Sequence, residues 1–143
     1  MKKILLAAST VLLTAMATFA QEPDPVIESQ FATDFPNATN VHFARVKNLN
    51  EVSFTQDKDM VTAYYDTRDQ LIGTMYNESF ADLPDNAQKE IRNKYPGYLI
   101  ANVVRFDDNQ SDDNYFAELK NDSKSIVLRI DLIGEVDYLT KMD

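Results

Sequence analysis

The apolar positions of the chain follow two periods, one typical of helices and one typical of strands. Ile27, Phe31 and Phe35 recur every four residues, which predicts the buried stripe of a helix. Asp24-Pro25 precedes this stripe as an N-cap followed by proline at the first helical position, and Pro36 ends it. We therefore expect a first helix between these two prolines.

Four strand-like runs follow this helix. Alternation is clearest where Val52 and Phe54 share one side of a run, and where Val61, Ala63 and Tyr65 share one side of the next. Short polar turns separate the runs, so we expect antiparallel hairpins. The predicted strands cover about residues 40–46, 50–56, 60–66 and 70–77.

A second helix is predicted to start near Asp82, with Pro84 in its first turn, and to stop at Pro96-Gly97. Its apolar stripe comprises Leu83, Ala87, Ile91 and Tyr95, and its last turn carries Arg92 and Lys94. Four more strands are expected at about residues 98–107, 114–121, 124–132 and 135–141, and the third of them alternates through Ile126, Leu128, Ile130 and Leu132.

The two halves of the chain share landmarks. Phe35-Pro36 ends the first helix as Tyr95-Pro96 ends the second, and Tyr65-Asp66 closes a strand as Ile130-Asp131 does later. We therefore predict an α+β fold of two tandem helix-plus-four-stranded antiparallel sheet repeats, at about residues 24–78 and 82–143. Each helix is expected to pack on one sheet face and to leave the other face open.

The first twenty residues have the composition of a signal peptide. Lys2 and Lys3 precede an apolar stretch at 4–17, and Thr18-Phe19-Ala20 offers small residues for cleavage before Gln21. The stretch is shorter than the roughly 20 residues that span a bilayer, although an uncleaved anchor is the alternative. We expect a mature protein of residues 21–143, periplasmic or secreted, without a membrane anchor. The chain has no cysteine, which excludes both disulfides and lipid attachment at an N-terminal cysteine.

The charge of the chain restricts its partners. Removing the leader takes away two lysines and no acid, so the formal net charge changes from −9 to −11. Nucleic acids and anionic membrane surfaces are bound mainly through Lys and Arg, so both are disfavoured. A protein partner with a basic surface or a bound cation would suit this charge, and solubility alone also explains it.

The order of these landmarks resembles the PepSY-like family, whose members are similar in fold to beta-lactamase inhibitory protein. The resemblance implies an exported protein of two tandem helix-and-sheet repeats with no established enzymatic activity. It does not imply inhibition of a beta-lactamase, because that inhibitor is held by disulfides and its binding residues have no matching motif in this sequence. The residues that carry it are Phe35-Pro36, Asn40-Val41-His42-Phe43, Ala63-Tyr64-Tyr65-Asp66, Leu71-Ile72-Gly73-Thr74, Leu83-Pro84, Tyr95-Pro96-Gly97-Tyr98 and Ile130 to Val136.

Catalytic chemistry finds little support in the sequence. His42 is the only histidine and cysteine is absent, so a nucleophilic triad would have to centre on His42. His42 lies in a predicted strand, and no serine near it has the signature of a nucleophile elbow. The acidic residues fall mostly in turns or on polar strand faces, where nothing raises their pKa for acid catalysis. We predict no enzymatic activity and no cofactor.

An acidic loop offers the one metal-site candidate. Its residues match positions 1, 3, 5, 7 and 12 of a calcium-loop template, but Asp112 occupies the place of the invariant glycine and strands flank the loop. We therefore assign no metal site, and a calcium- or cation-binding structural protein of the envelope is the alternative function. The template positions are Asp107, Asn109, Ser111, Asp113 and Glu118.

The main prediction is an exported, non-catalytic binding module, inhibitor-like toward a protein partner, that uses the open sheet face and the hairpin tips. Aromatic and arginine side chains on an open face are the types that anchor protein interfaces, although cross-strand pairs that only stabilise the sheet are the alternative. The acidic loop would select a basic surface. The candidate partner-binding residues are Thr62, Tyr64, Phe116, Arg129, Asp107, Asp108, Asp112 and Asp113.

Overall fold

The computed structural model describes residues 22–142. The predicted signal peptide at residues 1–20 lies outside this part of the chain. The eight predicted strands are all present within it, and each lies within one residue or two of its predicted bounds. They are β1 (Thr39–Val46), β2 (Leu49–Gln56), β3 (Asp59–Tyr65), β4 (Leu71–Glu78), β5 (Leu99–Asp108), β6 (Asn114–Lys120), β7 (Ser125–Asp131) and β8 (Val136–Met142).

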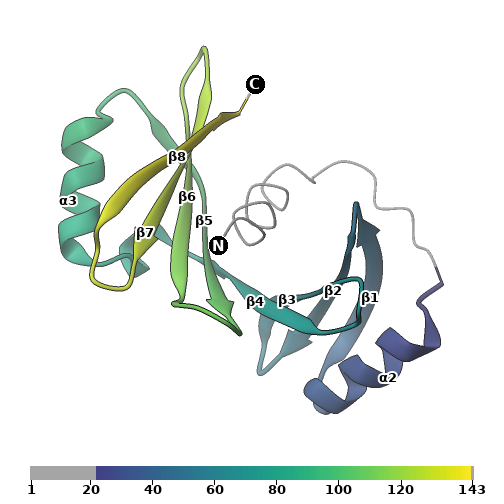
Figure 1. The fold of residues 1–143 in the computed structure, drawn as a ribbon. Helices are drawn as coiled ribbons and strands as arrows, with labels where there is room; N and C mark the ends of the chain where they lie inside the picture. Colours follow the sequence, from purple (N-terminus) through teal and green to yellow (C-terminus); the bar gives the residue numbers. More distant parts are fainter. Residues whose placement is uncertain (1–21, 143) are drawn as a thin grey trace.

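These strands form one antiparallel sheet in the order β1 to β8, which curves strongly between its two ends (Figure 1). The predicted architecture of two tandem helix-plus-four-stranded repeats is therefore wrong. Residues 73–78 of β4 pair in register with residues 103–108 of β5, from Gly73 opposite Asp108 to Glu78 opposite Val103. This pairing satisfies the backbone groups of two strands that separate sheets would leave as unpaired edges.

Helix α2 (Pro25–Asp34) begins as the sequence predicted. The side chain of Asp24 accepts a hydrogen bond of 3.0 Å from the backbone N–H of Val26, and Pro25 occupies the first turn. Ile27 and Phe31 are its buried residues, as the four-residue spacing indicated.

Helix α3 (Asp85–Lys94) starts later than predicted. A short 3₁₀ helix, η1 (Phe80–Asp82), precedes it, and Pro84 is the N-cap of α3 rather than a residue of its first turn. The side chain of Asp82 accepts hydrogen bonds from the backbone N–H and the hydroxyl of Ser79, which close the single turn of η1. Arg92 and Lys94 lie in the last turn as expected.

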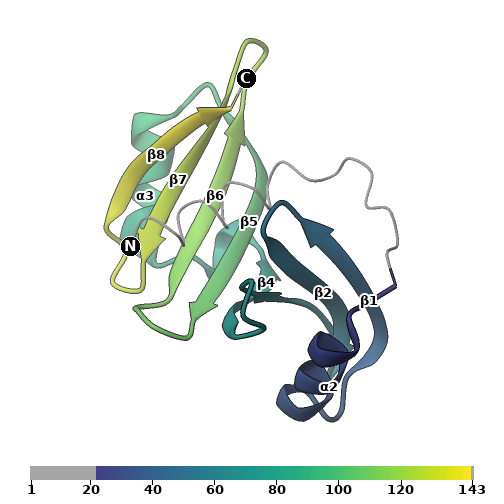
Figure 2. The ribbon, with the colours of Figure 1, turned by 45° about the vertical axis from the view of Figure 1, so that its right-hand side comes forward.

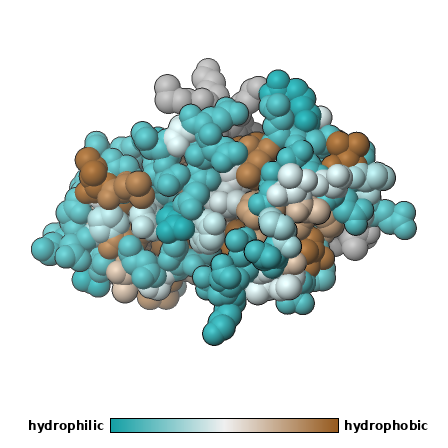
Figure 3. Space-filling view, turned by 90° about the horizontal axis from the view of Figure 1, so that it is seen from below, coloured by the Kyte–Doolittle hydropathy of each residue, from teal (hydrophilic) through white to brown (hydrophobic). Residues whose placement is uncertain are grey.

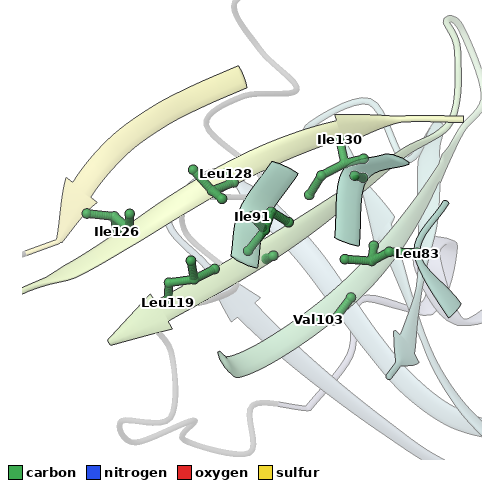
Figure 4. Packing of buried hydrophobic residues seen from close by; sticks show 9 residues of the cluster. Leu83, Ile91, Val103, Leu119, Ile126, Leu128 and Ile130 are labelled. Carbon is green, nitrogen blue, oxygen red and sulfur yellow. The ribbon is translucent and has the colours of Figure 1, made fainter. Parts of the chain in front are cut away.

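Both helices lie on the same face of the curved sheet, α2 against β1 to β3 and α3 against β5 to β8. Figure 2 shows α2 beside β1 and β2, and α3 beside β7 and β8. Cross-strand partners point to one face of a sheet, and Val61, Tyr76, Arg105, Tyr115 and Ile130 are successive partners from β3 to β7. Val61 belongs to the apolar cluster under α2, and Ile130 belongs to the cluster under α3. In Figure 4, Leu83 and Ile91 point toward Val103, Leu119, Leu128 and Ile130 of the sheet.

The opposite face of the sheet was predicted to be open, and this expectation is wrong. It carries a third buried cluster, to which strands alone contribute: Tyr64, Val104, Phe106, Phe116 and Val127, bordered by Leu49, Ile72, Met75 and Leu139. These residues occupy the positions between the helix-facing ones along each strand, so strands of the central sheet are apolar on both sides.

Candidate binding surface

The sheet brings four hairpin turns to one end, which we call the turn end. Consecutive antiparallel strands place alternate turns together, and the register confirms it: Val46 pairs with Leu49, Tyr65 with Leu71, and Gly73 with Asp108. Asn114, directly after the β5–β6 loop, pairs with Asp131, directly before the β7–β8 turn. The turn end comprises residues 47–48, 66–70, 109–113 and 132–135.

Hydrogen bonds within the loop order the acidic β5–β6 connection. The carboxylate of Asp108 accepts from the backbone N–H groups of Gln110 (2.7 Å) and Ser111 (3.2 Å), and from the Ser111 hydroxyl (3.0 Å). Asp113 Oδ1 accepts from the backbone N–H of Asp108 at 3.0 Å. The backbone N–H of Asn109 donates to the carbonyl of Ile72 at 2.9 Å, which ties the loop to β4.

The four acids predicted to select a basic surface therefore differ in their surroundings. Asp107 forms an ion pair of 2.7 Å with Arg105, while Asp108 and Asp113 hold the loop backbone. Asp112 is exposed, and its backbone carbonyl accepts a hydrogen bond from the Asn114 side chain at 2.7 Å. Asp112 is thus the member of this set best placed to contact a partner.

The calcium-loop pattern is not assembled in space. Glu118, its last position, lies within β6 opposite Asn102, where it is buried and bonds Ser125 (2.9 Å) and Lys120 (2.9 Å). Across residues 22–142, no group of three or more His, Cys, Asp or Glu side chains is arranged to hold a metal ion. His42 is exposed on β1 and pairs with Ser53.

The residues proposed on the open face are mostly covered. Tyr64 is 1% exposed, Phe116 is 2% exposed, and Thr62 is also buried. Thr62 shares a hydrogen bond of 3.4 Å with Ser53 on the neighbouring strand. These side chains were predicted to be exposed, and the structure differs. Tyr64 and Phe116 belong to the strand-only cluster, and Thr62 pairs with Met75 at its border. Their contact with a partner stays a prediction.

Arg129 lies opposite Phe116 and is the more accessible of the two. Its guanidinium forms an ion pair with Asp137 of β8, so its charge is balanced within the sheet. The buried hydroxyl of Tyr64 has no hydrogen-bond partner among the described residues. Burial, and then the neighbouring charge of Glu51, raises the pKa of Tyr64.

Two exposed apolar side chains at the turn end, Leu132 and Ile133, were not predicted from the sequence. Leu132 was predicted to lie in a strand because Ile126, Leu128 and Ile130 alternate up to it. In the structure β7 ends at Asp131, and Leu132 and Ile133 form the outside of the β7–β8 turn, 53% and 79% exposed. The sequence Asp131-Leu132-Ile133-Gly134 contains a turn signal at its two ends, which could have identified it.

The surface seen from below is mostly hydrophilic, with separate hydrophobic patches (Figure 3). No helix within residues 22–142 is long and apolar enough to cross a membrane.

Comparisons with known proteins identify the fold. No protein-family model matches the sequence, and no curated protein matches it. A DUF2874 family protein from Bacteroides uniformis is similar in structure, with a TM-score of 0.72 and 13% identity over 80% of this chain and 86% of that one. A BLIP-like protein from Bacteroides fragilis has a TM-score of 0.69 and 16% identity over 86% of this chain and 87% of that one.

A third similar structure is a Bacteroides eggerthii protein provisionally described as periplasmic, with a TM-score of 0.73 and 10% identity over 85% of this chain and 89% of that one. These identities are low, so the likeness establishes the fold and leaves the function to be argued from the site. A BLIP-like architecture agrees with the resemblance seen in the sequence.

Proposed function

We propose that the protein is an exported, non-catalytic binding module that uses its turn end to hold a protein partner with a basic surface. The observation that carries this proposal is the β5–β6 loop, which is ordered by its own carboxylates and keeps Asp112 exposed. A loop that is already ordered loses less conformational entropy on binding than a flexible one.

The charge of the molecule supports a basic partner. The chain without its leader carries a net charge of −11, because the total of −9 includes Lys2 and Lys3 of the leader. Complementary charge raises the association rate and disfavours acidic partners. Export is supported by the leader sequence and by the similar Bacteroides eggerthii structure, provisionally described as periplasmic.

An inhibitory role is the more specific form of the proposal. One similar structure is described as BLIP-like, and rigid loops at one end of a sheet suit insertion into the cleft of an enzyme. Under this form, the partner is an enzyme whose activity the bound module restrains.

The test is recovery of a partner from the exported fraction by the tagged protein and by Asp112→Lys. This substitution reverses an exposed charge and leaves the carbonyl bond to Asn114 in place. Asp122→Lys is the matched control, because it makes the same charge change in the exposed β6–β7 turn at the other end of the sheet. We expect Asp112→Lys to weaken recovery of one defined protein about tenfold, with a smaller effect from the control.

Equal recovery by the wild type and Asp112→Lys would contradict the use of this loop. If the recovered partner is an enzyme, its activity in the presence of the wild type and of Asp112→Lys tests the inhibitory form directly.

A further inference from the structure

Two turns at the turn end have the same hydrogen-bonded geometry. In the β3–β4 turn, Asp66 Oδ1 accepts from the backbone N–H of Arg68 (2.8 Å) and of Gln70 (3.1 Å), and the Asp66 carbonyl accepts from the N–H of Asp69 (3.1 Å). The N–H of Asp66 donates to the Gln70 carbonyl at 3.0 Å.

The β7–β8 turn repeats each of these bonds. Asp131 Oδ1 accepts from the N–H groups of Ile133 (3.1 Å) and Glu135 (2.8 Å), and the Asp131 carbonyl accepts from Gly134 (3.0 Å). The N–H of Asp131 donates to the Glu135 carbonyl at 3.2 Å. Asp69 and Gly134 both have positive φ, +59° and +87°.

The same turn geometry carries opposite surface chemistry. The outer positions of the β3–β4 turn are the polar pair Thr67 and Arg68, both exposed. The outer positions of the β7–β8 turn are Leu132 and Ile133, also exposed. Since the polar pair satisfies the turn equally well, the fold does not require apolar residues at this place, and exposing them to water is unfavourable.

A contact from α3 further fixes the apolar turn. The side-chain amide of Asn86 donates to the carbonyls of Ile133 (2.9 Å) and Gly134 (3.2 Å). A side chain at residue 134 would overlap Asn86, so glycine allows both the positive φ and this close approach. The two apolar side chains are therefore presented on a backbone that is held from both sides.

We infer that Leu132 and Ile133 form an apolar anchor that inserts into an apolar pocket of the protein partner, with basic side chains at the rim of that pocket. This inference rests on the proposed function and names the contact that accompanies the acidic loop. Asp131 pairs with Asn114, so the anchor lies beside the β5–β6 loop, and Glu135 adds an exposed carboxylate. Basic groups around the pocket complement these acids, whereas an anionic membrane surface would be repelled by them.

The test uses the turn that already occurs in the molecule. The double variant Leu132→Thr, Ile133→Arg gives the β7–β8 turn the outer residues of the β3–β4 turn, where Arg68 pairs with the aspartate of its own turn at 3.1 Å. We expect its unfolding midpoint to stay within a few degrees of the wild type, because both residues are exposed. The single variant Ile133→Ser serves the same purpose if the double variant is less stable.

The probe is p-benzoyl-phenylalanine at residue 135, introduced into the wild type and into the double variant, in the organism that carries the gene. The same probe at residue 67 in the β3–β4 turn is the matched control. We expect the probe at residue 135 of the wild type to form an adduct with one protein. The yield of this adduct should be at least tenfold lower in the double variant, and at least tenfold lower when the probe is at residue 67. Mass spectrometry should map the adduct to a site lined by apolar side chains with Lys or Arg at its edge.

Equal adducts from the wild type and the double variant would overturn the inference, as would an adduct with lipid or with a second copy of this chain. Loss of binding in Asp112→Lys with full binding in the double variant would leave the proposed function standing and remove the anchor. Full binding in both Asp112→Lys and the double variant would contradict the proposed function and the anchor together.

Discussion

The hydroxyl of Tyr65 in β3 donates a hydrogen bond of 2.9 Å to Asp34 Oδ2 at the end of α2. Burial raises the pKa of Tyr65, and the hydrogen bond and charge of Asp34 raise it further. Tyr65→Phe removes the donor and leaves the carboxylate without this bond. We expect a loss of about 1–2 kcal/mol in the free energy of unfolding, measured by urea denaturation.

Tyr138→Phe is the control for this change. Tyr138 is largely exposed on β8, so the same loss of a hydroxyl should change the free energy of unfolding by less than about 0.5 kcal/mol. Equal effects of the two substitutions would show that the bond between Tyr65 and Asp34 does not stabilise the attachment of α2.

Gly73 allows the close packing of β4 against β5. A Cβ atom at this position would lie 2.5 Å from the carbonyl oxygen of Asp107 and 2.6 Å from the ring of Phe106. Because the oxygen belongs to the backbone, the overlap cannot be relieved by a side-chain rotation alone. We expect Gly73→Ala to lower the free energy of unfolding by about 1–3 kcal/mol, measured by chemical denaturation.

Gly97 provides the comparison, since a Cβ atom there meets no atom within 4 Å. Gly97→Ala should be neutral or stabilise the protein by up to about 1 kcal/mol through the unfolded chain. A neutral Gly73→Ala would contradict the packing of Phe106 over this position.

The sequence predicted the strands well because the signals are local. Alternation such as that of Val61, Ala63 and Tyr65 depends on neighbours two residues away, and polar turns mark where each strand ends. The N-cap at Asp24 is local in the same sense. These features specify where elements form, and most predicted bounds agree with the structure to within two residues.

The pairing of β4 with β5, which joins the two halves into one sheet, could not be predicted from local signals. The pairing of β4 with β5 connects residues such as Met75 and Phe106, which lie far apart in the sequence and carry no local signal of register. The prediction therefore treated similar landmarks as separate units. The apolar residues at Val104 and Val127 were a partial signal, since strands that are apolar on both sides are typical of a central, covered sheet.

The candidate surface was predicted only where it depends on local sequence. The acidic loop is local, and its exposed Asp112 stands where the sequence placed it. The prediction that Tyr64 and Phe116 are exposed was wrong, because it assumed that one face of the sheet is open. Leu132 was placed in a strand by continuing an alternation past Asp131, whose side chain in fact closes the turn.

The β3–β4 and β7–β8 turns share a position with positive φ, so adding a side chain there and removing one should change the free energy of unfolding in opposite directions. Gly134→Ala places a side chain at φ +87° and against Asn86, so we expect the free energy of unfolding to fall by about 1–3 kcal/mol. Asp69→Gly relieves a non-glycine residue at φ +59° and should stabilise the protein by up to about 1 kcal/mol. Thermal and urea unfolding of both variants measure this difference. An unchanged stability of Gly134→Ala would contradict both the strain expected at φ +87° and the fixing of the turn by Asn86.

The half-buried carboxyl of Glu51 should make the free energy of unfolding depend on pH. Its neighbour across the β2–β3 pair is Tyr64, and burial raises the pKa of Glu51 above its ordinary value of 4.5. The folded state therefore binds this proton more tightly than the unfolded state. As the pH rises through 4.5 the unfolded chain releases the proton first, so the free energy of unfolding falls until the pH passes the higher pKa of the folded state.

Glu51→Gln removes this ionisation, so the variant should melt at a higher temperature than the wild type at pH 7. The difference should shrink below pH 4.5, where the carboxyl is protonated in both states and resembles the amide. Melting curves between pH 3.5 and 8, chosen at about half-unit steps, measure it. Glu135→Gln removes an exposed carboxylate and should not raise the melting temperature at pH 7. A Glu51→Gln curve parallel to the wild type at every pH would mean that burial of this carboxylate does not oppose its ionisation.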